Sequence, residues 1–147
     1  KRRALQEARD GKYVPIAVKL APDLDNDDIL RCVDVLVDQG IDAVIATNTT
    51  ISRDKVAGLP NAEQTGGLSG APLRERSTEV VHLIAEHVKE SLPIIASGGV
   101  MSGEDAVEKV QAGAKLVQLY TGFIYKGPAL VAECSEAVQR YRNTLSQ

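Results

Sequence analysis

Aromatic side chains, cysteines and long apolar runs are all scarce in this sequence. Aromatic residues make up 3% of the chain, tryptophan is absent, and the formal net charge is −3. Proteins that bind nucleic acids need a basic face and stacking rings, so this composition argues against a nucleic-acid partner. No apolar run reaches the roughly 18 residues of a membrane-spanning helix, and no signal-peptide pattern is present. Cys32 and Cys134 lie far apart in helix-like segments and are expected to be reduced packing residues.

What the sequence does contain is a regular alternation of two patterns. The chain has 147 residues, 44% of them hydrophobic, which is enough for one domain with a buried core. Short β-branched runs predict strands at residues 14–20, 43–47, 93–97 and 115–120. Apolar stripes at helical spacing predict helices at about 27–39 and 77–88, then one between Ser102 and Gly113, and one from Pro128 onward. Asp25 and Ser102 are the expected N-caps of the first and third helices, and Asp105 is expected to complete a weak capping box with Ser102.

Each predicted strand is followed by a helix, which is typical of a parallel sheet with helices on its outer face. The predicted fold class is α/β, a (β/α)₈ TIM barrel of which only about four β/α units are present. A complete barrel takes about 250 residues, and the chain opens at Lys1 as if partway through a helix. The interpretation is that residues 1–147 form half of one barrel domain. The long connection at 51–76 is expected to be functional or disordered.

In such a barrel the active site lies at the C-terminal ends of the strands. Gly98 and Gly99 follow the third predicted strand, and Gly122 follows the fourth. Backbone N–H groups after the last two barrel strands commonly hold a phosphate, and glycine lets the backbone approach its oxygens. The sequence therefore predicts a phosphate site and places these units in the C-terminal half. The alternative is that these are ordinary turn glycines.

Two polar residues at the other strands are further candidates. Lys19 lies within an apolar strand, where an ammonium group is costly unless it meets an anion or a polar ligand. Pairing with a nearby barrel carboxylate is the alternative. Asn48 carries a donor and an acceptor that match the amide-and-carbonyl edge of a pyrimidine. Loop capping by Asn48 and the adjacent threonines is the alternative there.

No metal site is predicted. Segment 23–28 (DLDNDD) begins like a calcium loop, but Asp28 stands where glycine is needed and a helix follows. His82 and His87 are five residues apart on one helix and so point in different directions. Ser69 has no histidine nearby in the sequence to activate it, so it is not taken as a nucleophile.

Five segments, in order and with matching spacing, resemble the dihydroorotate dehydrogenases, most closely the quinone-linked class 2 enzymes of bacteria. They are residues 18–23 (VKLAPD), 46–50 (ATNTT), 64–70 (QTGGLSG), 95–100 (IASGGV) and 116–123 (LVQLYTGF). The similarity covers essentially the whole chain. It implies an oxidoreductase, an FMN flavoprotein built as a (β/α)₈ barrel, that oxidises dihydroorotate to orotate in pyrimidine biosynthesis with quinone as electron acceptor.

The resemblance also implies residue roles. Lys19 would lie against the flavin ring, where its charge would stabilise the reduced, anionic flavin. Asn48 and Thr49 would hold the orotate ring. The residues expected to contact FMN are Lys19, Thr47, Gly70, Gly99, Tyr120 and Thr121. Gly70 and Gly99 would do so by backbone, while Tyr120 and Thr121 would close the phosphate cradle. Serine also stands at position 121 in the family, so Thr121 is a mild variation.

Part of the family's machinery is expected to precede Lys1. The class 2 catalytic base is a serine in the earlier half of the barrel, so no catalytic residue is assigned in this chain. The N-terminal helices that meet the membrane and quinone would also lie there. A location peripheral to the bacterial cytoplasmic membrane would therefore depend on that missing region. The N-terminal half of the same barrel is the expected partner.

Two alternatives stay open. The first is the soluble class 1 family or another FMN barrel, such as a dihydropyrimidine or dihydrouridine enzyme. Class 1 uses a cysteine as base, so the sequence before Lys1 would decide between them. The second alternative is that the 147-residue chain, taken alone, is not an enzyme but a folding or assembly fragment.

Overall fold

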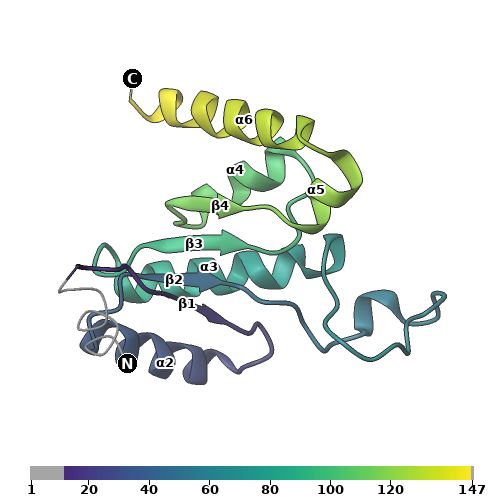
Figure 1. Cartoon of the computed structure of the whole chain (residues 1–147), viewed down its shortest axis with the longest axis horizontal. Coiled ribbons are helices and arrows are strands. Elements are labelled where there is room, and N and C mark those ends of the chain that lie inside the picture. Colours follow the sequence, from purple (N-terminus) through teal and green to yellow (C-terminus); the bar gives the residue numbers. More distant parts are fainter. Residues whose placement is uncertain (1–11, 147) are drawn as a thin grey trace.

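The computed structural model of the chain describes residues 12–146 (Figure 1). One parallel sheet has the strand order β1-β2-β3-β4, with β1 at Ala17–Leu20, β2 at Ala43–Ala46, β3 at Ile94–Ser97 and β4 at Leu116–Gln118. The helices are α2 (Asn26–Asp38), α3 (Arg74–Val88), α4 (Gly103–Gln111), α5 (Thr121–Lys126) and α6 (Ala129–Leu145). The 3₁₀ turns η1 (Asp54–Val56) and η2 (Ala71–Leu73) lie between β2 and α3.

The strands pair in chain order, and the register runs straight across the sheet. Lys19 is paired with Ile45, Ile45 with Ile95, and Ile95 with Leu116. Figure 1 shows α2 at the β1 end of the sheet, and α4 with α6 at the β4 end. Consecutive parallel strands joined through helices are successive β/α units, which confirms the predicted α/β class. The helix-like opening at residues 1–8 lies outside the described residues.

Burial alternates along the first two strands, although both of their faces are largely apolar. Val44 and Ala46 of β2 are fully buried among the helices, where they meet residues such as Val33 of α2 and Ile84 of α3. Ile45, between them, faces the other side and is only half-buried. The helices therefore cover one face of the sheet, and the opposite face holds the row that contains Lys19 and Ile45.

Two predicted helix starts are confirmed by their capping bonds. Asp25 accepts a hydrogen bond from the Asp28 N–H at 2.7 Å, and Ser102 accepts one from the Asp105 N–H at 3.2 Å. Each bond satisfies one of the free N–H groups that a helix leaves at its first turn. The expected reciprocal bond from Asp105 to the cap does not form, because its carboxylate accepts from the Met101 N–H instead.

Three predicted boundaries are wrong. The first strand begins at Ala17 rather than Val14, because Pro15 has no N–H and the Ile16 N–H donates to the Asp42 side chain at 2.7 Å. The fourth strand ends at Gln118, and the short helix α5, which the sequence did not predict, follows almost at once. Helix α3 begins at Arg74, three residues before the predicted start at Ser77.

One side chain, that of Arg53, forms several of the hydrogen bonds that hold the long connection after β2. The Arg53 guanidinium donates to the Gln64 carbonyl at 3.0 Å and to the Gly66 carbonyl at 2.6 Å, and also to carbonyls near its own position. Thr50 and Leu68 exchange backbone hydrogen bonds of 3.0 and 2.8 Å. These bonds join the two ends of the segment between Thr50 and Leu68, which is called the excursion below. In Figure 1 the excursion projects beyond the C-terminal ends of the strands.

Within residues 12–146, β1 and β4 each pair with a neighbouring strand on one side only. An open sheet edge exposes N–H and C=O groups that can pair with strands of other chains. Apolar side chains add to the exposed surface at β4, where Leu116 is 62% exposed.

We expect that the 147-residue chain, prepared alone, does not persist as a monomer. It should form a dimer or larger assembly, or aggregate, because its edge strands and the uncovered face of the sheet recruit other chains. Leu116→Lys should raise the monomer fraction. Leu145→Lys, at a 68% exposed position at the end of α6, should not. Size-exclusion chromatography with light scattering measures both, and a monodisperse wild-type monomer across concentrations would contradict the expectation.

Candidate functional site

A cavity of about 240 Å³ lies at the C-terminal ends of the strands. Every candidate residue predicted from the sequence lines it, namely Lys19, Thr47, Asn48, Thr49, Gly70, Gly99, Tyr120 and Thr121. These residues come from the ends of β1, β2 and β3, the loop before α3, and the turn between β4 and α5. The structure therefore brings together in one place segments that are up to a hundred residues apart. Which ligand each residue contacts stays a prediction.

After β3 the wall of the cavity consists of main chain, at positions where only glycine can be accommodated. Gly98 and Gly99 have φ of +115° and +75°, values that favour glycine. A Cβ on Gly99 would lie 2.3 Å from the Cα of Arg74, in the first turn of α3. A Cβ on Gly122, in α5, would lie 2.3 Å from the Val100 carbonyl oxygen. The backbones of β3, α3 and α5 therefore meet with no side chain between them.

The N–H groups of this loop are available to a ligand. In the described part of the chain, neither the Gly98 N–H nor the Gly99 N–H has a protein acceptor. Buried backbone donors are almost always paired, with protein, water or ligand. Gly99 is buried and lines the cavity. Free donors on a glycine backbone suit an anion with several oxygens, such as a phosphate.

The opposite wall is the end of the long connection. Gly70 has φ of +84°, and a Cβ there would lie 3.0 Å from the Cγ2 of Thr121. The Thr121 hydroxyl donates to Ser69 Oγ at 3.1 Å, so this loop closes onto the first residue of α5. Tyr120, just before α5, is largely exposed at the mouth of the cavity. Ser69, set aside as a nucleophile from the sequence, is a wall residue here.

Lys19 lines the cavity but is not buried, which corrects the premise that its ammonium lies within an apolar environment. Side chains alternate along β1, and Leu20 takes the helix-covered side while Lys19 takes the other. No carboxylate of residues 12–146 forms an ion pair with it. The alternative of a barrel carboxylate partner is therefore not found in this part of the molecule, and Lys19 stays available to a ligand.

The residues after β2 show the loop-capping interaction and leave the ligand interpretation of Asn48 open as a prediction. Asn48 Oδ1 accepts from the Thr49 N–H at 2.9 Å, which is the loop-capping bond. The side chains of Asn48 and Thr49 are nevertheless exposed at the cavity. Thr47 is 1% exposed, and its hydroxyl donates to the Asn48 carbonyl at 2.9 Å. The proton of that hydroxyl is therefore used within the loop, while its oxygen can still accept a hydrogen bond from a ligand in the cavity.

Two other polar residues line the cavity: Ser97 of β3, which the sequence places at a strand end but to which no role was assigned, and Gln118 of β4, which sequence reasoning missed. Both occupy the last position of their strand, and they are paired in the register. Their position relative to the strand end was the signal that could have identified them. Their side chains add hydrogen-bonding capacity to the inner side of the sheet.

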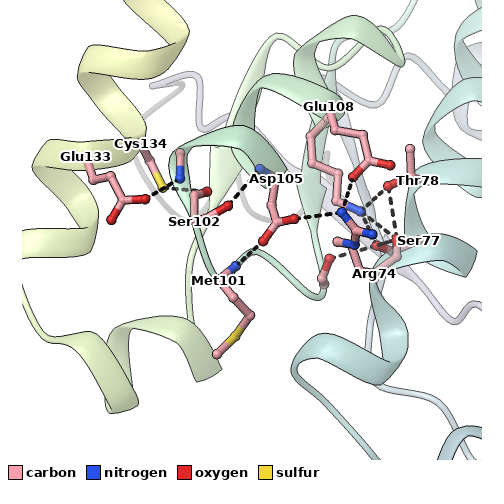
Figure 2. A network of polar contacts seen from close by, with 12 residues as sticks. Arg74, Ser77, Thr78, Met101, Ser102, Asp105, Glu108, Glu133 and Cys134 are labelled. Atoms are coloured by element: carbon pink, nitrogen blue, oxygen red, sulfur yellow. Dashed lines mark hydrogen bonds and ion pairs between the residues drawn. The ribbon is translucent and has the colours of Figure 1, made fainter.

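A polar network behind the glycine loop was also missed (Figure 2). At its centre Lys109 of α4 is 0% exposed, and its ammonium donates to the Arg74 carbonyl at 2.9 Å, Ser77 Oγ at 2.5 Å and Thr78 Oγ1 at 2.6 Å. Burial lowers the pKa of Lys109 to about 8, although the nearby carboxylate of Glu108 acts in the opposite direction. Ser77 in turn donates to the Gly98 carbonyl at 2.8 Å, so the network reaches the cavity wall.

A second branch of this network holds the chain just after the glycine loop. Arg74 forms an ion pair with Asp105 at 2.9 Å, and hydrogen bonding to that carboxylate raises the pKa of Arg74. The other carboxylate oxygen of Asp105 accepts from the Met101 N–H at 2.9 Å. Figure 2 shows Asp105 between Met101 and Arg74, linking the two. The loop is therefore anchored at both of its ends.

Membrane spans and metal clusters are both absent from residues 12–146. No helix in this range is long and apolar enough to cross a membrane. The same residues contain no group of three or more histidine, cysteine, aspartate or glutamate side chains placed to hold a metal ion. Cys32 and Cys134 are both free thiols, and burial raises the pKa of Cys134.

Comparisons with known proteins agree with this architecture. The family model described as dihydroorotate dehydrogenase matches residues 1–141. A dihydroorotate dehydrogenase (quinone) of Thiobacillus denitrificans is 63% identical over 126 residues, covering 86% of this chain and 37% of that protein. The protein of the same name from Marinomonas sp. is 55% identical over 139 residues, covering 95% of this chain and 40% of its own length.

A solved structure gives the same result in three dimensions. The dihydroorotate dehydrogenase of Eimeria tenella, determined in complex with ferulenol, superposes with a TM-score of 0.84 and 37% identity. The match covers 92% of this chain and 36% of that one, and the chain spans about two fifths of the length of the curated relatives named above. The four parallel β/α units are part of a TIM barrel, as predicted. The chain belongs to the dihydroorotate dehydrogenase family.

Proposed function

We propose that this chain is the cofactor-binding part of a quinone-dependent dihydroorotate dehydrogenase, which oxidises dihydroorotate to orotate in pyrimidine biosynthesis. The observation that carries the proposal is the convergence of all the candidate residues on one cavity with a glycine-backbone wall. The named relatives are quinone enzymes, which favours the class 2 assignment over class 1 or another FMN barrel.

The residues present fit FMN as the cofactor. A Cβ at Gly99 or Gly122 would clash with neighbouring backbone, and the loop N–H groups have no acceptor in residues 12–146. These donors, with Gly70, Tyr120 and Thr121, would hold the phosphate. Lys19 would lie by the ring system, where its charge favours electron uptake. When bound, FMN supplies the site with a two-electron acceptor.

Orotate would be held by the exposed side chains of Asn48 and Thr49 in the loop after β2. Since Asn48 Oδ1 is committed to the Thr49 N–H, the Nδ2 group is the part of Asn48 left to donate to a carbonyl of the pyrimidine. The Thr49 hydroxyl lies beside it at the cavity. We assign no catalytic base in this chain. The base, the contact with quinone and any association with a membrane belong, in this proposal, to the N-terminal part of the protein.

In the full-length enzyme, Lys19→Ala should slow reduction by dihydroorotate about a hundredfold while leaving folding nearly unchanged. A charge directed at the place where negative charge develops is worth about 3 kcal/mol of barrier. Anaerobic stopped-flow absorbance of the flavin measures the rate. Lys12→Ala removes an exposed lysine from the segment before β1 and is the control. A Lys19→Ala rate within about twofold of the wild type would remove Lys19 from this role.

Two substitutions at Asn48 separate substrate binding from loop capping. Asn48→Ala loses both functions, whereas Asn48→Asp keeps an oxygen for the Thr49 N–H and loses the Nδ2 donors. Both should weaken orotate at least about tenfold and retain FMN, because a buried carbonyl of the ligand is left unpaired. Orotate titration and flavin absorbance measure the two affinities, with Asn61→Ala in the exposed loop as control. Loss of FMN with orotate binding intact would reverse the ligand assignment.

The chain alone should not oxidise dihydroorotate, because the proposal assigns the base to the N-terminal part of the protein. Adding the N-terminal half of the barrel in trans should restore FMN binding and activity together, since the phosphate cradle and the base lie on different pieces. A quinone-coupled assay on the purified chain, with and without that half, tests this. Activity of the chain by itself would show that the base has been misplaced.

A further inference from the structure

A fully buried ammonium group lies directly behind the cavity wall. Lys109 projects from α4 into the first turn of α3, and no carboxylate within residues 12–146 forms an ion pair with it. Burying a charge without a contacting counter-charge is costly, and such positions are concentrated at functional sites. The three protons of the ammonium go to three oxygens, those of the Arg74 carbonyl, Ser77 and Thr78.

The direction of every hydrogen bond in this cluster follows from the chemistry of its members. An ammonium group has no lone pair, so both hydroxyls must accept from Lys109 and keep one proton each to donate. The Thr78 proton goes to the Arg74 carbonyl at 3.0 Å. That carbonyl oxygen then already accepts from both Lys109 and Thr78. The Ser77 proton is therefore directed to the Gly98 carbonyl, at 2.8 Å, rather than to Arg74.

The resulting chain runs from the Lys109 ammonium through the Ser77 hydroxyl to the Gly98 carbonyl. The peptide bond between Gly98 and Gly99 is trans, so its N–H points away from its C=O. With the carbonyl bound on the α3 side, the Gly99 N–H is turned away from α3. Gly99 lines the cavity, and this N–H has no acceptor in the described residues. Hydrogen bonds in series polarise one another, so a carbonyl that accepts strongly makes the N–H of the same peptide a stronger donor.

The charge that starts this chain is retained at neutral pH. Burial lowers the pKa of Lys109 to about 8, Glu108 and Asp105 raise it, and Arg74 lowers it. The ammonium form therefore predominates at pH 7.

We propose that Lys109 is a positioning residue for the anion site: through Ser77 it orients and polarises the Gly98–Gly99 peptide so that the Gly99 N–H donates to a phosphate in the cavity. This inference rests on the proposed function, because the phosphate is that of FMN. Lys109 lies outside the cavity, yet in this proposal it contributes to the affinity for the phosphate group of FMN. It contributes nothing to the affinity for the flavin ring.

The test compares FMN with riboflavin, which has the same ring system and no phosphate. Dissociation constants for both are measured by flavin fluorescence on the full-length apoprotein at pH 7. Lys109→Met and Ser77→Ala should each weaken FMN at least about tenfold, the loss expected for a hydrogen bond to a charged group. Riboflavin should change by less than about twofold, because it makes no contact that depends on this peptide.

Thr78→Val is the matched control. It removes a contact to the same ammonium but leaves the bond from Ser77 to Gly98 in place. It should therefore lower the melting temperature without changing the ratio of FMN to riboflavin affinity. A changed ratio in Thr78→Val would show that any disturbance of the cluster has the same effect, which contradicts the relay.

The double variant with Lys109→Met and Ser77→Ala decides whether the two residues act in series. If they do, the ratio of FMN to riboflavin affinity should be the same in the double variant as in either single variant, because each substitution removes the same contact to the phosphate. Additive losses would overturn the relay, as would equal losses of both flavins. If Lys109→Met does not fold, the FMN-to-riboflavin ratio of Ser77→Ala alone decides whether the relay holds. A wild-type protein that binds both flavins equally would instead refute the phosphate assignment in the proposed function.

Discussion

The approach of the Gly98–Gly99 backbone to the first turn of α3 is the contact on which the cavity depends. A Cβ at Gly99 would lie 2.3 Å from the Cα of Arg74, so the two backbones touch directly. Gly122 makes the same kind of contact with the Val100 carbonyl. Side chains adapt to a small shift by changing rotamer, whereas backbone against backbone has no such freedom. The position of α3 therefore fixes the loop, and the loop fixes the start of α5.

Most of the architecture follows from local patterns in the sequence. Apolar stripes at helical spacing predicted α2, and the caps Asp25 and Ser102 predicted the starts of α2 and α4, because these signals act within one or two turns. The cavity was predictable for a related reason. Parallel strands present their C-terminal ends at one edge of the sheet. Once the strands had been predicted, residues at those ends, such as Lys19 and Asn48, could therefore be expected to lie close together.

The features that escaped prediction depend on contacts between distant parts of the chain. In the sequence Lys109 is one more polar residue of an amphipathic helix, and its partners Ser77 and Thr78 are 32 and 31 residues away. The start of β1 is set by the Asp42 side chain, which lies 26 residues from Ile16. Helix α5 is only six residues long, with Gly122 inside it, so neither periodicity nor propensity marks it. The exposure of Lys19 reflects which face of the sheet the helices cover, and no short window of sequence contains that.

The hydrogen bonds of Arg53 have a consequence for how this protein can vary. Its guanidinium bonds only to main-chain carbonyls across the excursion, including those of Gln64 and Gly66, and makes no hydrogen bond to a side chain there. Every amino acid carries a main-chain carbonyl, so these bonds do not depend on which side chains the excursion holds. Substitutions between Asp54 and Glu63 that keep the backbone path therefore leave them intact. Loss of Arg53 removes all of them and leaves the backbone pairing of Thr50 with Leu68 and the ion pair of Lys55 with Glu75. The shape of this segment therefore depends more on one guanidinium group than on the side chains between Asp54 and Glu63.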